Sequence, residues 1–186
     1  MENLPGNTTQ SLRNSALSVI PLCLKPVYLN MTETPIYLAW NKPIDREPIA
    51  PIDPSIPPSL KPIAALGVED EGLVLFTDDP KAVLREQECE VTISEPLSKE
   101  AIHIINKGML VQGEFYSGLT ISRLSNRGKR SIVSVISEDD SHGRIRLMFA
   151  SLGHPPLSLR CIRINGRSLG TLSPGQWKFI KKQDAI

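Results

Sequence analysis

The chain has 186 residues, of which 40% are hydrophobic and 22% charged, and this is enough apolar material for one well-buried domain. Its formal net charge of +1 excludes a strongly acidic disordered chain and a histone-like polycation. No apolar run approaches the roughly 18 residues that a membrane span needs, so we expect a cytoplasmic protein without membrane contact. The three cysteines, Cys23, Cys89 and Cys161, form no Cys-x-x-Cys pair, which favours a reducing compartment over a disulfide framework or a zinc knuckle.

The charges are divided unevenly along the chain. Residues 123–186 carry 12 Lys and Arg against 4 Asp and Glu, whereas residues 1–122 carry 9 against 16. A basic C-terminal third is typical of a protein that contacts a polyanion. Attraction between the two portions within one fold would produce the same division, and the charges alone favour neither interpretation.

Seven apolar segments have the length and composition of β-strands. They lie at residues 36–40, 73–77, 89–93, 120–124, 132–136, 157–164 and 177–180. A proline-rich segment follows the first strand, and proline removes a ladder donor and blocks a helix interior, so we expect a loop there. Asn165-Gly166 is a turn signal between the last two strands.

Two helices are also predicted. Ser98 caps a helix over residues 99–107, which ends at Gly108. The second helix ends at Gly153, and one of its faces carries Ile145, Met148, Phe149 and Leu152. The sequence therefore predicts an α+β domain rich in hairpins over residues 35–182, between a poorly ordered tail at residues 1–34 and a short one at residues 183–186.

Several motifs stand in the order found in a known family. They are Tyr37-Leu-Ala-Trp-Asn41-Lys42-Pro43, Glu71-Gly72-Leu73-Val-Leu-Phe-Thr77-Asp78-Asp79, Arg146-Leu-Met148-Phe-Ala-Ser-Leu152-Gly153-His154-Pro155, Leu159-Arg160-Cys-Ile-Arg163-Ile, Leu169-Gly-Thr-Leu172 and Ser173-Pro174-Gly175-Gln-Trp177. Together they resemble the RsuA/RluE branch of the bacterial RNA pseudouridine synthases over residues 35–181. Many members carry a separate RNA-binding domain at the N-terminus, and we expect none here because the first 30 residues are too few for it.

The resemblance implies a fold and an activity. The fold is a mixed, largely antiparallel sheet with flanking helices and hairpin loops. The activity is the isomerisation of uridine in RNA, usually ribosomal RNA, after the target nucleotide has left the base stack. The resemblance also implies an aspartate nucleophile, a tyrosine that stacks on the base and an arginine that pairs with the carboxylate. It further implies a monomer without a cofactor or a metal.

The nucleophile position of the family is altered in this chain. The family motif Gly-Arg-Leu-Asp-x-x-Thr precedes Glu-Gly-Leu, and counting back from Glu71 without gaps places Gly67 at the aspartate. A gap of three residues would make Asp70 the nucleophile instead, although it would shift the following strand and reverse its faces. We expect the ungapped register, with Glu69, Asp70 and Glu71 in a solvated acidic turn.

Two further positions of the family's pocket are also affected. Cys89 stands at the position of the stacking tyrosine, where we expect a buried small hydrophobe and, as the alternative, a reactive thiol. Arg146 stands where the family keeps an arginine, with Arg144 one position off the pattern, but Gly67 offers Arg146 no carboxylate partner. Three changes in one pocket lead us to expect a pseudoenzyme that retains the fold.

We expect the histidines and tryptophans to have structural roles and not catalytic, metal-binding or base-stacking ones. His154 follows a helix end, and His103 and His142 have no companions at metal-ligand spacing. Trp40 and Trp177 lie in or beside strands, and we expect them in the core rather than as base-stacking platforms.

The basic residues are the candidates for RNA contact, with an exposed hairpin tip and a helix N-terminus as the phosphate sites. They are Lys42, Arg123, Arg127, Lys129, Arg130, Arg144 and Arg146. Our leading hypothesis is an inactive RNA-binding protein that acts on ribosomal RNA. The alternatives are an active synthase that uses Asp70 and a protein-interaction scaffold that docks through its proline-rich loop.

Overall fold

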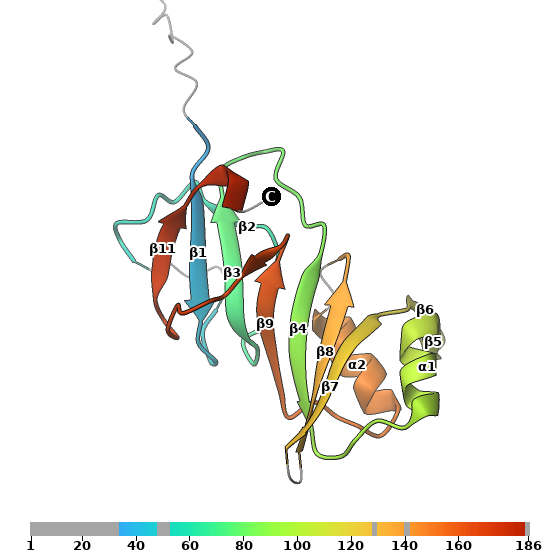
Figure 1. The fold of residues 1–186 in the computed structure, drawn as a ribbon. Helices are drawn as coiled ribbons and strands as arrows, with labels where there is room; N and C mark the ends of the chain where they lie inside the picture. Colours follow the sequence, from blue (N-terminus) through green and yellow to red (C-terminus); the bar gives the residue numbers. More distant parts are fainter. Residues whose placement is uncertain (1–33, 48–52, 128–129, 140–141, 185–186) are drawn as a thin grey trace, which may run out of the picture. The chain divides into compact units, whose positions relative to one another are not determined.

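The structure is a computed structural model that describes residues 34–47, 53–127, 130–139 and 142–184. Its main strands are β1 (Tyr37–Lys42), β3 (Glu71–Thr77), β4 (Gln87–Ile93), β7 (Thr120–Arg127), β8 (Arg130–Ser137), β9 (Ser158–Ile164) and β11 (Trp177–Ile180). Within the described chain they form one sheet in the order β11-β1-β3-β9-β4-β8-β7 (Figure 1). Strands β3 and β9 pair in parallel and all other neighbours on this path are antiparallel, which confirms the mixed, largely antiparallel sheet of an α+β fold.

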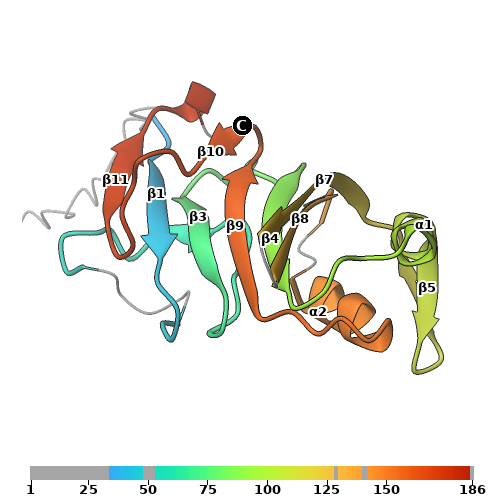
Figure 2. The same cartoon turned by 60° about the horizontal axis from the view of Figure 1, so that its bottom comes forward.

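The remaining elements are short. Strands β2 (Lys61–Pro62) and β10 (Arg167–Ser168) pair with β3 and β9, and a 3₁₀ turn covers Lys182–Asp184. Helices α1 (Lys99–Lys107) and α2 (His142–Ser151) lie near the β8–β7 end of the sheet in both views (Figures 1 and 2). Strands β5 (Gly108–Val111) and β6 (Glu114–Ser117) form a separate hairpin. Neither α-helix in the described ranges approaches the length or apolar character of a membrane span.

Local sequence explains both ends of α1. The Ser98 hydroxyl accepts a hydrogen bond from the backbone N–H of Ala101 at 3.1 Å, which satisfies a donor that the first turn leaves free. Gly108 follows the last turn with φ +90°, a conformation that glycine adopts without strain. The predicted bounds of this helix are therefore confirmed.

One part of the core lies between the sheet and α2, and the rest surrounds β1 and β3. Ile145, Met148 and Phe149 are fully buried on one face of α2, and alternate residues of β4, including Cys89 and Val91, are buried opposite. Trp40 belongs to the same core, with its ring centroid 6.3 Å from that of Phe76. The apolar periodicities of the sequence thus identify the elements that build the core.

All seven predicted strands are confirmed, with bounds that differ by a few residues. The β5–β6 hairpin and the short strands β2 and β10 were not predicted. Residues 1–33, most of the predicted N-terminal tail, lie outside the described residues, as do residues 48–52 of the proline-rich loop and 185–186 of the C-terminal tail.

Candidate functional site

Asp70 and Arg146 form the centre of the candidate site. Asp70 closes a turn in which its backbone N–H donates to the carbonyl of Gly67 at 3.1 Å, directly before β3. The turn directs the carboxylate toward α2, where Arg146 donates to Oδ1 from Nε at 2.9 Å and from Nη2 at 2.5 Å. The Asp70 side chain is only 4% exposed. The expectations that Asp70 is solvated and that Arg146 has no carboxylate partner are therefore wrong.

The Asp70 carboxylate also occupies the space beside Gly67. A Cβ atom added to Gly67 would lie 3.1 Å from Oδ2 of Asp70. The family's aspartate position and the observed carboxylate thus belong to one small region, although the backbone that supplies the carboxylate is three residues further along the chain. Gly67 can therefore stand at the family's aspartate position while Asp70 supplies a carboxylate to the same pocket. The motifs alone did not predict this arrangement.

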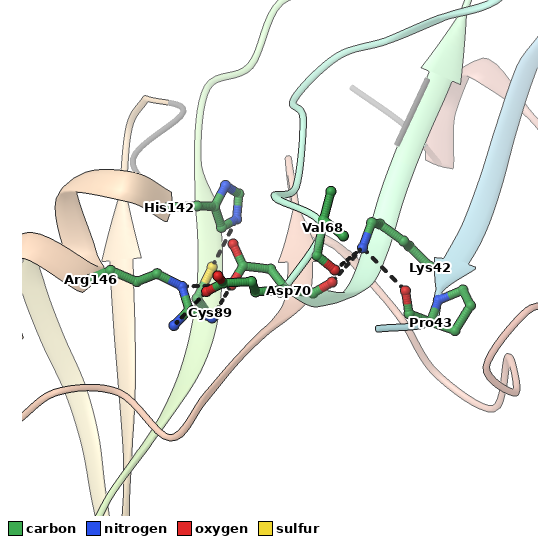
Figure 3. Close-up of polar contacts among 8 residues, drawn as sticks. Lys42, Pro43, Val68, Asp70, Cys89, His142 and Arg146 are labelled. Carbon is green, nitrogen blue, oxygen red and sulfur yellow. Dashed lines mark hydrogen bonds and ion pairs between the residues drawn. The ribbon is translucent and has the colours of Figure 1, made fainter. Parts of the chain in front are cut away.

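Lys42 supports this turn from the other side (Figure 3). Its ammonium is fully buried and donates to the backbone carbonyls of Asp70 at 2.6 Å and of Val68 and Pro43 at 3.2 Å each. Burial lowers the pKa of Lys42, and the charge of Asp70 is the largest effect that opposes the shift. The expected contact between Lys42 and RNA phosphate is wrong, because its three donors face the protein's own backbone.

A pocket of about 510 Å³ opens at this pair. It is lined by Ala65, Gly67, Val68, Glu69, Asp70, His142, Gly143 and Arg146. Glu69 stands at the rim, where its 79% exposed side chain lies 3.7 Å from Nη1 of Arg146. Chemically, the pocket offers a carboxylate oriented by charge-assisted hydrogen bonds and a guanidinium for an anionic ligand. None of these lining residues is Phe, Tyr or Trp, so the imidazole of His142 and the guanidinium of Arg146 are the planar groups that border the pocket.

The position of the family's tyrosine lies behind this pocket. Cys89 is fully buried, and its Sγ is 3.4 Å from Nε2 of His142, the first residue of α2. Cys161 of β9 pairs in register with Cys89 and is also fully buried. A hydrogen bond with Cys89 is the largest cause that lowers the pKa of the Cys161 thiol, against the effect of burial. Cys89 is thus buried as expected, but it has two chemically active neighbours.

The remaining basic candidates do not converge on this pocket. Arg144 makes two hydrogen bonds to the Asp139 carboxylate, at 2.7 and 2.8 Å, and lines a second pocket. Arg123 and Arg130 are exposed on β7 and β8. The register Arg127↔Arg130 confirms the predicted hairpin, whereas Lys129 lies outside the described residues. Contact of these residues with RNA stays a prediction.

The other histidines and the tryptophans have the expected structural roles in part. The His154 backbone N–H donates to the Phe149 carbonyl at 2.9 Å, which closes the end of α2 as a structural role requires. His103 is exposed on α1. Trp177 is partly buried, and its ring centroid lies 5.5 Å from that of Phe179. His142 departs from expectation, because the fold brings Cys89 and Cys161 to it.

No protein-family model matches the chain. The chain is 22% identical over 191 aligned residues to an uncharacterized RNA pseudouridine synthase of Aquifex aeolicus (strain VF5), which covers 91% of this chain and 74% of that protein. A crystal structure of a pseudouridylate synthase matches with a TM-score of 0.67 and 23% identity, over 81% of this chain and 72% of the other. The chain therefore has the pseudouridine synthase fold. Its place in the RsuA/RluE branch stays a prediction.

Proposed function

We propose that this protein binds RNA and isomerises uridine to pseudouridine, with Asp70 as the nucleophile. The observation that carries this proposal is the Asp70–Arg146 pair, a buried carboxylate with two hydrogen bonds from one guanidinium at the edge of a pocket. The similarity to an RNA pseudouridine synthase supports RNA as the substrate class. Ribosomal RNA is the substrate that we expect from the motifs.

In the proposed reaction the Asp70 carboxylate first acts as the nucleophile and later as the leaving group. One carboxylate oxygen attacks C1′ of the flipped uridine, and the N1–C1′ bond breaks with its electron pair going to the uracil ring. The ring turns, C5 bonds to C1′, and the carboxylate leaves. The proton on C5 is lost to solvent and N1 takes one up, so the product is an isomer of the substrate. Arg146 orients Asp70 throughout and is a positioning residue in this scheme.

RNA binding without isomerisation is the second candidate function. It is favoured by Cys89, which is buried at the position of the family's stacking tyrosine, and by the lack of Phe, Tyr and Trp among the residues that line the Asp70 pocket. A flipped base in this pocket would meet no Phe, Tyr or Trp ring, and His142 is the lining residue with an aromatic ring. The exposed Arg123 and Arg130 support phosphate contact in either case.

Tritium release distinguishes the two candidates. RNA that carries tritium at C5 of uridine, ribosomal RNA included, releases the label only when C5 bonds to C1′. We expect release by the wild-type chain and by the control Glu69→Gln, which removes the exposed rim carboxylate, and none by Asp70→Asn. Release that persists in Asp70→Asn would refute the role of Asp70.

RNA affinity is measured on the same proteins by filter binding over a series of salt concentrations. Binding without release by any protein would establish the second candidate, with an affinity that falls as salt rises. Crosslinking in cells followed by RNA recovery tests both candidates together. No enrichment of RNA above a nonbinding control would favour the protein-interaction scaffold.

A further inference from the structure

We propose that Cys89, Cys161 and His142 bind one divalent metal ion of the zinc class. The three residues come from strands β4 and β9 and from the first turn of helix α2. Each offers one ligand atom, and these atoms all lie within 4.8 Å of one another. The site goes beyond the proposed function, because metal binding requires neither RNA nor Asp70.

The distances suit a tetrahedral ion. With Zn–S bonds of about 2.3 Å and Zn–N bonds of about 2.0 Å, a tetrahedral site separates sulfur from nitrogen by about 3.5 Å. The Sγ of Cys89 and the Nε2 of His142 are 3.4 Å apart. The two cysteines face each other in register on neighbouring antiparallel strands, so both side chains leave the sheet on the side that faces α2.

The kinds of ligand select the metal. Thiolate and imidazole favour zinc and similar borderline or soft ions, whereas magnesium and calcium prefer oxygen ligands. Two thiolates, a neutral imidazole and a divalent cation sum to zero charge. This balance suits three side chains that are each at most 4% exposed, because an unbalanced charge is costly to bury.

The surrounding backbone holds the ligands in place. Gly72 packs so closely against Cys161 that an added Cβ would lie 2.2 Å from the Cys161 carbonyl oxygen. The Sγ of Cys161 is 3.7 Å from the Arg163 carbonyl oxygen, and the helix that carries His142 is fixed by its buried apolar face. Such support fixes ligand geometry before a metal arrives.

Three protein ligands leave a fourth coordination position. His142 also lines the pocket of Asp70 and Arg146, whereas Cys89 and Cys161 do not, so we expect the metal and a water molecule as its fourth ligand to enter beside His142. Sites with two cysteines, one histidine and an open position occur among catalytic zinc centres. We expected no metal from the family resemblance and from the spacing of the cysteines and histidines, and spacing does not detect ligands that only the fold brings together.

The test uses the full chain, reduced and stripped of metal with a chelator. We expect one Zn²⁺ per chain by elemental analysis, and Co²⁺ in its place should give intense sulfur-to-cobalt charge-transfer absorption. The chain has three cysteines, so the control Cys23→Ser should keep that absorption and thereby assign it to Cys89 and Cys161. Zn²⁺ should also raise the melting temperature of the wild-type chain.

Ligand variants complete the test. We expect Cys89→Ser, Cys161→Ser and His142→Gln each to weaken Zn²⁺ binding at least about 100-fold. If a variant does not fold, wild type and Cys23→Ser still decide the question. Absence of Zn²⁺ and of Co²⁺ absorption in the reduced wild-type chain would overturn the proposal. So would a disulfide between Cys89 and Cys161 that persists in mild reductant, or absorption that disappears in Cys23→Ser alone.

Discussion

Two buried carboxylates stand at opposite ends of strand β3, and the protein holds them in different ways. Asp70 precedes the strand and pairs with Arg146, whereas Asp79 follows it and pairs with Lys182 at 2.8 Å. Both side chains are 4% exposed, and each borders a surface hollow. Burial, a cation and a hollow therefore do not distinguish a functional carboxylate from a structural one.

The hydrogen bonds of the two carboxylates make the difference. At Asp79, Oδ2 accepts from the Tyr37 hydroxyl at 2.6 Å and from Lys182, and Oδ1 accepts from the Lys81 backbone at 2.9 Å. These interactions, the Lys182 bond first, hold the pKa of Asp79 well below its usual range. At Asp70, donors from the described chain reach Oδ1 only. An oxygen without a donor is available for chemistry, so we infer that Asp70 serves function and Asp79 serves stability.

The largest expected effect is the opposite response of two variants: Asp70→Asn should lose activity, and Asp79→Asn should lose stability. Asp70→Asn should lower tritium release from uridine at least about 10³-fold, because an amide is a poor nucleophile. Its unfolding midpoint in urea should fall less than that of Asp79→Asn, because donors reach one oxygen of Asp70 and both oxygens of Asp79. Asp79→Asn should lower the unfolding midpoint and leave the rate of release by the folded protein unchanged. Equal losses of activity in the two variants would contradict the distinction.

A swap of side chains sharpens the same prediction. Gly67→Asp with Asp70→Thr restores the family's order of residues, and the added carboxylate starts from the backbone beside the present one. We expect this double variant to release tritium and Asp70→Thr alone to release none. Activity in neither protein, with RNA binding intact, would favour the function without isomerisation.

The next effect concerns the start of β3. Gly72 has φ +112°, and a Cβ there would lie 2.8 Å from the Cys161 backbone nitrogen as well as close to its carbonyl oxygen. Gly72→Ala should lower the free energy of unfolding by about 4 kcal/mol, from backbone strain and overpacking together. Gly143→Ala is the control, because an added Cβ there meets nothing within 4 Å and alanine favours a helix. Urea unfolding measures both, and a tolerated Gly72→Ala would contradict the close approach.

Lys42 gives a somewhat smaller effect at the same end. Lys42→Met removes the donors to three backbone carbonyls and should lower the free energy of unfolding by about 3 kcal/mol. Lys61→Met is the matched control on exposed β2 and should change unfolding by less than about 0.5 kcal/mol. Reduced RNA affinity in Lys42→Met without a loss of stability would restore the phosphate contact that the structure argues against.

The sequence was informative where local chemistry decides the structure. The Ser98 cap and Gly108 determine α1 within the chain itself, and the apolar face of α2 needs only the helical period. The β5–β6 hairpin escaped prediction because its turn places Gln112 at φ +53° before Gly113, and glutamine is not a usual residue for that conformation. Apolar periodicity predicts burial, but it does not show which polar residue a turn will direct inward.

The candidate site depends on such directions. The motif comparison located Gly67 and Arg146, yet the conformation of the turn between Gly67 and Asp70 decides where the carboxylate points. The cluster of Cys89, His142 and Cys161 joins residues 53 and 19 positions apart in the chain, and only the pairing of β4 with β9 and the packing of α2 brings them together. The spacing of these residues in the sequence therefore does not predict their contacts.

The smallest expected effect tests the structural carboxylate through pH. Burial, first, and the hydrogen bond to Asp79 raise the pKa of Tyr37 to about 12. Above about pH 10 the unfolded chain loses this proton while the folded chain keeps it, so folding becomes linked to proton uptake. The stability that Tyr37 contributes is complete below about pH 10 and is lost as pH rises toward 12.

Tyr37→Phe removes this titration. Between about pH 10 and 12 the wild-type chain should lose about 2–3 kcal/mol more unfolding free energy than Tyr37→Phe, as two pKa units imply. Urea unfolding at each pH measures the difference, and Tyr28→Phe, at a position outside the described residues, controls for titration of another tyrosine. If the unfolding free energies of wild type and Tyr37→Phe changed in parallel with pH, the hydrogen bond between Tyr37 and Asp79 would not contribute to stability. The contrast between the two ends of β3 would then rest on the Lys81 backbone N–H and on Lys182, whose side chain is 51% exposed and whose ion pair is correspondingly weak.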